Sequence, residues 1–424
     1  MRIDHIQVNN YRCFEKFNCR FDPRLTLLMG ENGLGKSSLL SAIVDSLGPL
    51  FETHIEEESV RHKRAIDPGD TTWRMQVYPC VIGSTVLVLG ESFHLWAARI
   101  PNQSIWWPPE LSKNHQTHLD IQRMQNLRDQ WTNPLQPEPV PVIARFGASD
   151  SFNGSGKPTQ VRQPFESKIE AWKRALETKV DVQLLAQWFQ YNELRSLQEG
   201  SAPIPYVAAR KAVLSAIHAV DIKYVVRDNQ LMVHHKDQGW RPWEHLSDGQ
   251  KRIAAIYCEI ALRCATLNSH LAERCIVDSP GIVLIDELDL HLHPLWQRSV
   301  IGDLLRVFPS LQFIVASHSP FLLQAAFEYG KVVDMRTGEF VQPGDPSIED
   351  IAETVMGVDQ PQRGRRFLDL KAKATEYIQL LESKPTTPEE LARVKAELDG
   401  HMADFANDPA SAAWLAQQRE AAGL

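Results

Sequence analysis

Residues 30–37 carry the clearest chemistry in the chain, because their sequence, GENGLGKS, fits the phosphate-binding pattern G-x-x-x-x-G-K-[ST]. The glycines let the backbone turn tightly enough for its N–H groups to face phosphate oxygens, and a following helix adds the positive end of its dipole. The pattern predicts that Lys36 reaches the β- and γ-phosphates of a nucleotide and that Ser37 ligates Mg²⁺. The phosphate-binding candidates are Gly30, Asn32, Gly33, Gly35, Lys36, Ser37 and Ser38.

Two carboxylates at the end of an apolar run form a second element. Residues 282–285 read as a central parallel strand, and Asp286 and Glu287 follow at the edge of the sheet where ligands bind. An aspartate in this position holds Mg²⁺ through water, and a neighbouring glutamate can orient or deprotonate an attacking water. The pair therefore predicts the hydrolytic half of a nucleotide site, with Glu287 as a catalytic residue and Asp286 as a metal ligand.

Residues 246–250, with the sequence LSDGQ, resemble the L-S-x-G-Q signature of the ABC ATPase superfamily. Ser247 is suited to cap a helix, and the start of that helix is suited to bind phosphate. In that superfamily this helix serves the nucleotide bound by the opposite subunit. The resemblance therefore implies that Ser247, Gly249 and Gln250 bind ATP across a dimer interface, whereas the motif taken alone indicates only a helix N-cap.

A fourth element lies further along the chain, where an apolar strand predicted at 313–316 leads to His318. This arrangement resembles the switch histidine of ABC ATPases, which touches the γ-phosphate. The four elements follow one another in the order and with the spacing typical of that superfamily. We therefore expect Lys36, Glu287 and His318 to act together in catalysis.

Hydrophobic periodicity indicates the elements that must position these residues. We expect strands at 3–8, 14–21, 25–29, 74–77, 85–89, 94–98 and 140–144, helices from 38 and within 166–218, strand pairs within 221–235, a helix from 247 to about 267, a loop over 268–280 and a helical segment over 367–424. With the ABC resemblance, these elements predict an α/β fold, a P-loop NTPase of ABC-ATPase type with an antiparallel β layer and a helical lobe. The expected parts are 1–100 and 221–345 for the two halves of the ATPase head, 101–220 for an irregular and helical insertion lobe, and 346–424 for a helical tail.

Bulk composition excludes several classes of protein. With 424 residues, 43% of them hydrophobic, the chain can bury a sizeable core, and its net charge of −8 argues against a general nucleic-acid coat, though not against a local basic groove. We see no apolar run of membrane-spanning length and no targeting segment at the N-terminus, and we expect a cytoplasmic protein without membrane contact. The six cysteines lack C-x-x-C spacing, which favours free thiols over a zinc ribbon or a redox motif.

Most of the chain resembles bacterial ABC-type, SMC/RecF-like ATP-binding proteins, whose relatives include the ATPase subunits of Septu and retron-linked anti-phage systems. Besides the four motifs, the resemblance is carried by residues 6–14, 142–147, 285–294 and 355–358. It implies a switch that binds ATP and Mg²⁺, forms a homodimer or a higher oligomer of dimers around ATP, and controls an effector protein such as a nuclease. It also implies that Arg12 helps to hold nucleotide phosphate and that Asp289 lies in a loop facing the other subunit.

Three features stay open at this point. No Q-loop glutamine is evident, and Gln76 is the candidate. His291 and His293 are spaced like a metal pair, but in the resembled family this stretch faces the other subunit. The adjacent Trp106 and Trp107 could dock a partner or could close over the core of their own domain.

Two other functions also remain. One is a nucleotide-gated scaffold, in which ATP holds an assembly together and turnover is incidental. The other is a DNA-repair or recombination ATPase resembling RecF-like heads, with nucleic acid as a possible partner. The candidate phosphate contacts are two basic runs, which usually form only a solvated surface. They comprise Arg61, Lys63 and Arg64 in the first run, and Arg363, Arg365 and Arg366 in the second.

Overall fold

The computed structural model describes residues 1–48, 80–100, 103–105, 138–148, 180–341 and 347–358, together with scattered residues between 120 and 133 and between 364 and 417. The chain divides into two compact units, residues 1–348 and 349–424. In the second unit, the described residues form the π-helix η6 at Ile351–Val355 and isolated helical positions. All four sequence motifs lie in the first unit.

A mostly parallel sheet forms the centre of the first unit, and six strands of it lie within the described residues. In spatial order these are β14 (Phe340–Val341), β13 (Lys331–Asp334), β3 (Leu25–Met29), β12 (Leu311–Ala316), β11 (Gly281–Ile285) and β7 (Val142–Phe146). Among these six described strands, only the β13–β14 pair is antiparallel. Every residue of β3, β11 and β12 is buried, because layers of structure cover both faces of the sheet.

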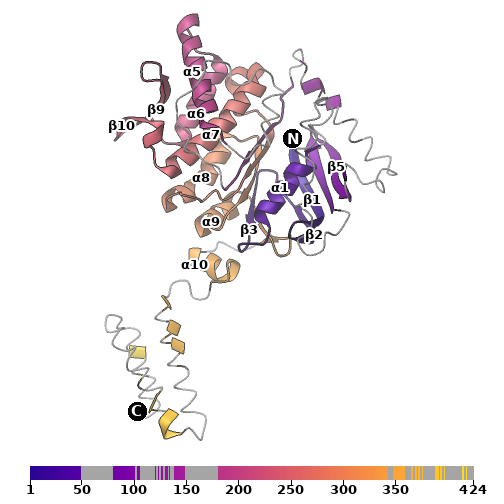
Figure 1. The fold of residues 1–424 in the computed structure, drawn as a ribbon, viewed down its shortest axis with the longest axis vertical. Coiled ribbons are helices and arrows are strands. Elements are labelled where there is room, and N and C mark those ends of the chain that lie inside the picture. Colours follow the sequence, from indigo (N-terminus) through magenta and orange to yellow (C-terminus); the bar gives the residue numbers. More distant parts are fainter. Residues whose placement is uncertain are drawn as a thin grey trace. The chain divides into compact units, whose positions relative to one another are not determined.

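One face of this sheet carries helices, and the other carries an antiparallel layer. Figure 1 shows α6, α7, α8 and α9 on one side of the sheet and α1 with the antiparallel strands on the other. The helices of the two faces are α1 (Lys36–Ser46), α6 (Ile204–Ala216), α7 (Asp248–Leu267), α8 (Pro294–Val307) and α9 (Pro320–Tyr329). The strands of the antiparallel layer, in spatial order, are β2 (Phe14–Arg20), β1 (Arg2–Tyr11), β4 (Cys80–Val88), β5 (Glu91–Ile100) and β6 (Gln103–Ile105).

Gln312 joins the parallel and antiparallel sheets from within β12. Its Oε1 accepts a hydrogen bond from Ile3 N at 2.8 Å, and its Nε2 donates to Ile3 O at 2.7 Å and to Asp22 O at 2.8 Å. The side chain is 1% exposed, so a buried amide has its polar atoms satisfied by the backbone of the other layer. These hydrogen bonds fix the two sheets relative to each other at the start of β3, at the opposite end of that strand from the phosphate loop.

The helical lobe contains α5 (Val182–Glu199) and α6, and a small antiparallel sheet of three described strands packs against these helices. Its strands are β8 (Asp221–Val225), β9 (Gln230–His235) and β10 (Gly239–Pro242). Asp181 begins α5 by accepting hydrogen bonds from the N–H groups of Gln183 and Leu184. Gln190 Nε2 donates to Tyr224 Oη at 2.9 Å, which ties α5 to β8.

The predicted α/β P-loop fold with an antiparallel layer and a helical lobe is confirmed, with local differences. The expected strand at 140–144 is β7, which starts two residues later because Asn268 bonds both N and O of Val140 and Pro141 has no N–H. The segment 268–280 contains the 3₁₀-helix η5 (Ser269–Arg274), where only a loop was expected. The expected strand at 74–77 lies outside the described residues.

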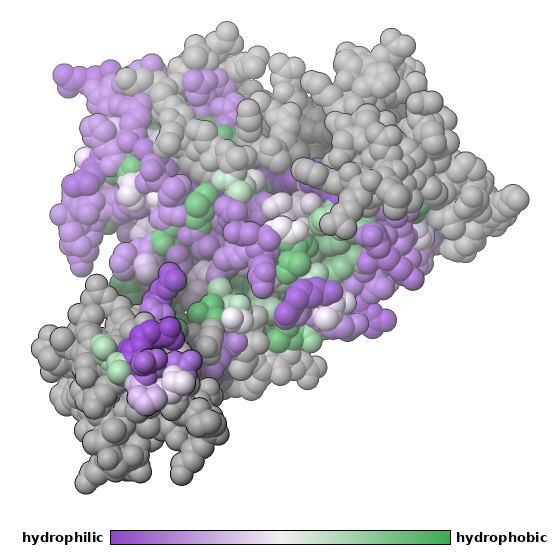
Figure 2. Space-filling model, turned by 60° about the horizontal axis from the view of Figure 1, so that its bottom comes forward, coloured by the Kyte–Doolittle hydropathy of each residue, from purple (hydrophilic) through white to green (hydrophobic). Residues whose placement is uncertain are grey.

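The described surface in Figure 2 is mostly hydrophilic, and the cysteines are unpaired as their spacing predicts. On the face drawn in Figure 2, hydrophilic residues cover most of the described surface, with smaller hydrophobic patches between them. No helix within the described ranges has both the length and the apolar character that crossing a membrane requires. All six cysteines are free thiols, five of them buried, and burial raises the pKa of Cys264 to about 12.

Candidate functional site

The phosphate loop connects β3 to α1 and turns through glycines in the left-handed region. Gly33 and Gly35 have φ values of 90° and 91°, and Gly35 is the N-cap of α1. A Cβ atom on Gly35 would lie 2.4 Å from Cys13 Sγ and 2.5 Å from Phe14 Cζ. Glycine is therefore required at position 35 both for the backbone conformation and for the close packing against the end of β1 and the start of β2.

Lys36 is the first residue of α1, and its ammonium group lies inside the phosphate loop. Nζ donates to Gly30 O at 2.7 Å and to Glu31 O at 3.1 Å. Burial lowers the pKa of Lys36, while the carboxylates of Asp286 and Glu287 oppose that shift. The phosphate loop and the acidic end of β11 therefore interact electrostatically, as a site for a nucleotide and its cation requires.

The other residues predicted to bind phosphate differ in their exposure. Ser37 and Asn32 are exposed, and Ser38 is half-buried. Arg12 follows β1 with a φ of 49°, and its Nη1 donates to Ser41 Oγ on α1 at 3.1 Å. The structure therefore places Arg12 against the second turn of the helix that begins the phosphate site.

Arg145, near the end of β7, reaches the same hydroxyl and was not predicted as a site residue. Its Nη2 donates to Ser41 Oγ at 2.8 Å, and Ser41 Oγ in turn donates to Ser37 O at 2.9 Å. Burial lowers the pKa of Arg145, and the nearby Asp45 opposes that shift. The signal in the sequence was a charged residue inside the otherwise apolar strand VIARF.

Asp286 and Glu287 follow β11 and open a turn over residues 286–292, which we call the Walker B turn. Asp286 N donates to Phe146 O at 2.8 Å, so the strand pairing continues to the first carboxylate. Glu287 has a φ of 48°, in the left-handed region that side chains with a Cβ rarely adopt. Asp286 is buried and Glu287 is half-buried, so the two carboxylates have different environments.

The carboxyl ends of β11 and β12 bring His318 to the same place. Ser317 Oγ donates to Asp289 Oδ1 at 2.6 Å, which joins the end of β12 to the Walker B turn. Burial lowers the pKa of His318, the charge of Lys36 lowers it further, and the neighbouring carboxylates raise it. The net shift of the pKa is downward, which favours the neutral imidazole with one N–H to donate.

The donor set at Asp286 fits a hard cation. Oδ1 of Asp286 is buried and has no hydrogen-bond partner among the residues that the structure describes. A buried carboxylate oxygen is costly unless a donor or a cation meets it. Mg²⁺ commonly uses one or two carboxylate ligands together with substrate phosphates, so the environment of Asp286 agrees with its predicted role as a ligand.

His291 and His293 each have a structural place in the Walker B turn and the start of α8. Within the described ranges, no group of three or more His, Cys, Asp or Glu side chains could hold a metal by itself. His293 is the N-cap of α8, where its Nδ1 accepts a hydrogen bond from Leu295 N at 3.3 Å. The spacing of His291 and His293 is therefore explained by a turn and a helix cap.

The signature motif begins α7 with a capping box. Ser247 Oγ accepts from Gln250 N at 3.3 Å, and Gln250 Oε1 accepts from Ser247 N at 3.0 Å. Ser247 is exposed and Gly249 is buried. A Cβ on Gly249 would lie 2.4 Å from His291 O, so the start of α7 packs directly on the backbone of the Walker B turn.

Gly249→Ala is expected to destabilise the protein by about 1–3 kcal/mol, because the new methyl group meets a fixed carbonyl oxygen. Gly302→Ala in α8 is the matched control, since the nearest neighbours of its Cβ would be Tyr329 atoms at 3.4 Å or more. That change is expected to stabilise the protein by about 0.4–1 kcal/mol. Thermal unfolding of both variants measures the difference, and equal melting temperatures would contradict the close packing at Gly249.

Several predicted features lie outside the described residues. They are Gln76, Trp106, Trp107, the basic run Arg61, Lys63 and Arg64, and Arg363 and Arg366 of the second basic run. Arg365 lies in the second unit and is exposed. The described residues at the carboxyl edge of the parallel sheet thus contain Lys36, Asp286, Glu287 and His318, whereas Ser247–Gln250 lie at the start of α7.

Two protein families match parts of the chain. Residues 1–73 match the family described as "AAA ATPase domain". Residues 143–324 match the family described as "AAA domain, putative AbiEii toxin, Type IV TA system". The two matches contain the phosphate loop, the signature helix, the Walker B turn and His318.

Three curated proteins show how far the similarity extends. The retron Ec83 probable ATPase of Escherichia coli is 49% identical over 388 residues, covering 76% of this chain and 69% of that protein. The Septu protein PtuA of Bacillus thuringiensis is 23% identical over 369 residues, covering 84% of this chain and 85% of that protein. The retron Vc95 probable ATPase of Vibrio cholerae is 46% identical over 79 residues, which are 19% of this chain and only 15% of that protein.

Proposed function

We propose that this chain, which belongs to the family of the retron Ec83 probable ATPase, is an ATP-driven switch in anti-phage defence. Membership of that family shows that the chain is an ATPase, and its action as a switch is the proposal. In the proposed organisation, residues 1–100 and 221–345 build the ATPase head, 101–220 the insertion lobe and 346–424 the tail. The proposed location is the cytoplasm, in keeping with ATP as substrate and with free thiols.

One observation carries this proposal, namely the convergence of four side chains at one edge of the sheet. β3, β12 and β11 are adjacent parallel strands. Lys36 follows the first of them, His318 the second, and Asp286 and Glu287 the third. Ligands of open α/β sheets bind outside the carboxyl ends of the strands, so this is where a nucleotide would be held.

Each group then has a chemical role. The phosphate loop, with Gly30, Asn32, Gly33, Gly35, Lys36, Ser37 and Ser38, would bind the phosphates together with Arg12. The Glu287 carboxylate accepts a proton from the attacking water, and neutral His318 donates its N–H to the γ-phosphate. Mg²⁺, held by Ser37 and Asp286, would neutralise charge that develops on the phosphate oxygens.

The signature residues support a second copy as partner. In the described part of the chain, the side chains of Ser247 and Gln250 hydrogen-bond only to each other's backbone N–H groups. Because Ser247 is exposed at a helix start, it is free to meet a phosphate from outside. We propose that Ser247, Gly249 and Gln250 bind the ATP held by the other copy, and that the resulting dimer, or an oligomer of dimers, controls an effector such as a nuclease.

Ser247→Arg tests the shared site, because an arginine at the exposed helix start would fill the space of the phosphate in the one site that this helix completes. The variant is expected to bind ATP but to lose turnover and any ATP-dependent increase in mass. Lys36→Ala is also expected to lose turnover, because it lacks the cation that faces the phosphates. Mixing equal amounts of the two inactive variants should restore up to about a quarter of the wild-type activity. Half of the dimers then contain one copy of each variant, and each such dimer has one intact site out of two. Full activity of Ser247→Arg alone would show that each copy works by itself.

A further inference from the structure

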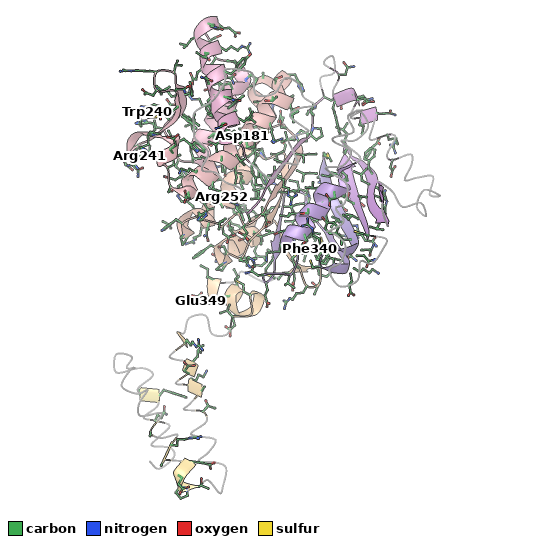
Figure 3. The ribbon with its side chains drawn as sticks, viewed as in Figure 1. Asp181, Trp240, Arg241, Arg252, Phe340 and Glu349 are labelled. Carbon is green, nitrogen blue, oxygen red and sulfur yellow. The ribbon has the colours of Figure 1, made fainter. Side chains whose placement is uncertain are left out.

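Arg252 on α7 is a buried cation to which no role has been given so far. It is 1% exposed, and its Nη2 donates to Asp286 O at 2.8 Å and to Glu287 O at 3.1 Å. Figure 3 labels this side chain within the helical layer of the first unit. One guanidinium nitrogen thus holds the backbone of both residues that carry the hydrolytic carboxylates, through charge-assisted bonds that are stronger than neutral ones.

The backbone at Glu287 needs such support. Its φ of 48° lies in the left-handed region, and a non-glycine residue stays there only when the surrounding structure fixes it. Glu287 O also accepts Leu290 N at 3.0 Å, so Arg252 reinforces a turn that already has a local hydrogen bond. The far end of the Walker B turn is held separately, by Gln297 Nε2 on Leu292 O at 2.8 Å.

Arg252 and the signature motif share one face of α7. Gly249 and Arg252 are spaced i, i+3, so they are neighbours on the helix surface. Gly249 lies against His291 O, and Arg252 lies against the carbonyls of Asp286 and Glu287. The first turns of α7 therefore contact both ends of the Walker B turn, with no side chain intervening at Gly249.

We infer that Arg252 is a positioning residue that fixes the orientation of the Glu287 carboxylate and couples it to the start of α7. This inference rests on the proposed function, in which Glu287 activates water and the start of α7 meets the nucleotide of a second copy. A shift of α7 caused by that nucleotide then reaches the backbone of Glu287 directly through the Arg252 side chain. Hydrolysis in one copy becomes dependent on occupancy of the neighbouring site.

Two substitutions of Arg252 test this role. Arg252→Met keeps an apolar stem but removes the guanidinium group that makes both hydrogen bonds. It is expected to lower kcat for ATP hydrolysis by about 100-fold through misplacement of Glu287. ATP affinity and KM should stay close to wild type, because the phosphate loop is untouched. Arg252→Lys keeps an ammonium group that can donate to the carbonyls, so it should recover part of kcat. A residue that only fills space would show no such rescue.

The matched control removes a buried ion pair from the same helix. Glu259 and Arg263 form a buried ion pair on α7, with Arg263 Nη2 and Glu259 Oε1 2.6 Å apart. The double variant Glu259→Met, Arg263→Met deletes both charges together and is expected to keep wild-type kcat. Loss of turnover in this control as well as in Arg252→Met would assign the effect to helix stability and overturn the inference.

A second measurement does not depend on turnover. Hydrogen–deuterium exchange without nucleotide should become faster in Arg252→Met or Arg252→Lys for peptides that cover residues 286–292, and not for those that cover β4 and β5. Unchanged exchange in the Walker B turn overturns the inference even if the wild type hydrolyses ATP. If the wild-type protein does not hydrolyse ATP, that result contradicts the proposed function and not this inference. Hydrogen–deuterium exchange in residues 286–292 then still tests the role of Arg252. If Arg252→Met does not fold, Arg252→Lys carries both measurements.

Discussion

Glu287→Gln is expected to lower kcat for ATP hydrolysis by about 10²–10⁴-fold, the contribution of a positioned general base. Glutamine keeps the size and hydrogen-bonding reach of the side chain but cannot accept the proton of the attacking water. The phosphate loop and Lys36 are unchanged, so ATP should still bind, and the ATP-bound dimer should accumulate because the step that opens it is blocked. Phosphate release and light scattering in the presence of ATP measure the two effects.

The control for this result is Glu273→Gln, an exposed glutamate on η5 away from the strand ends. It should leave both turnover and mass unchanged. If Glu287→Gln turns over ATP at the wild-type rate, Glu287 is not the base. If Glu287→Gln loses turnover but still controls an effector, the protein acts as a nucleotide-gated scaffold, and loss of that control in Lys36→Ala would confirm the dependence on bound ATP.

Lys36→Ala is expected to lower kcat/KM by about 10³-fold or more, since it removes the cation that faces the phosphates. The substitution also removes the hydrogen bonds to Gly30 O and Glu31 O that hold the loop. The carboxylates of Asp286 and Glu287 then lose a nearby positive charge and repel the nucleotide. ATP turnover together with binding of a fluorescent ATP analogue measures the loss.

Lys211→Ala, at an exposed position of α6, serves as the control for removal of a lysine and should keep wild-type kinetics. Lys36→Arg should not rescue activity, because the residue is 7% exposed and the larger guanidinium does not fit a space shaped for an ammonium. Turnover by Lys36→Ala above about a tenth of the wild-type rate would exclude the phosphate-binding role of this lysine.

The chemistry of the site could be predicted from sequence where it depends on neighbouring residues. The phosphate loop, the strand before Asp286 and the start of α7 are each specified by a short local pattern. The signature helix is the clearest case, since Ser247 and Gln250 have the spacing of a capping box and the structure shows both of its hydrogen bonds. The expected end of that helix, near Leu267, is also confirmed.

Contacts between distant segments could not be predicted in this way. Arg145 and Ser41 are 104 positions apart, and Arg252 and Asp286 are 34 apart, so no local pattern records either contact. The left-handed conformation of Glu287 is equally invisible in the sequence, because glutamate has no preference for it. The catalytic role of each motif residue remains a prediction until the variants are measured.

The order of strands in the parallel sheet has a consequence for synthesis of the chain. β3 and the phosphate loop leave the ribosome early, but the strands that flank β3 are β12 and β13, which end at Ala316 and Asp334. Ribosome-bound chains that stop before these strands contain the complete GENGLGKS motif without the sheet edge that aligns it. Because such non-local pairing is slow, we expect ATP binding to begin only at a late stage of folding, after β12 and β13 have joined β3.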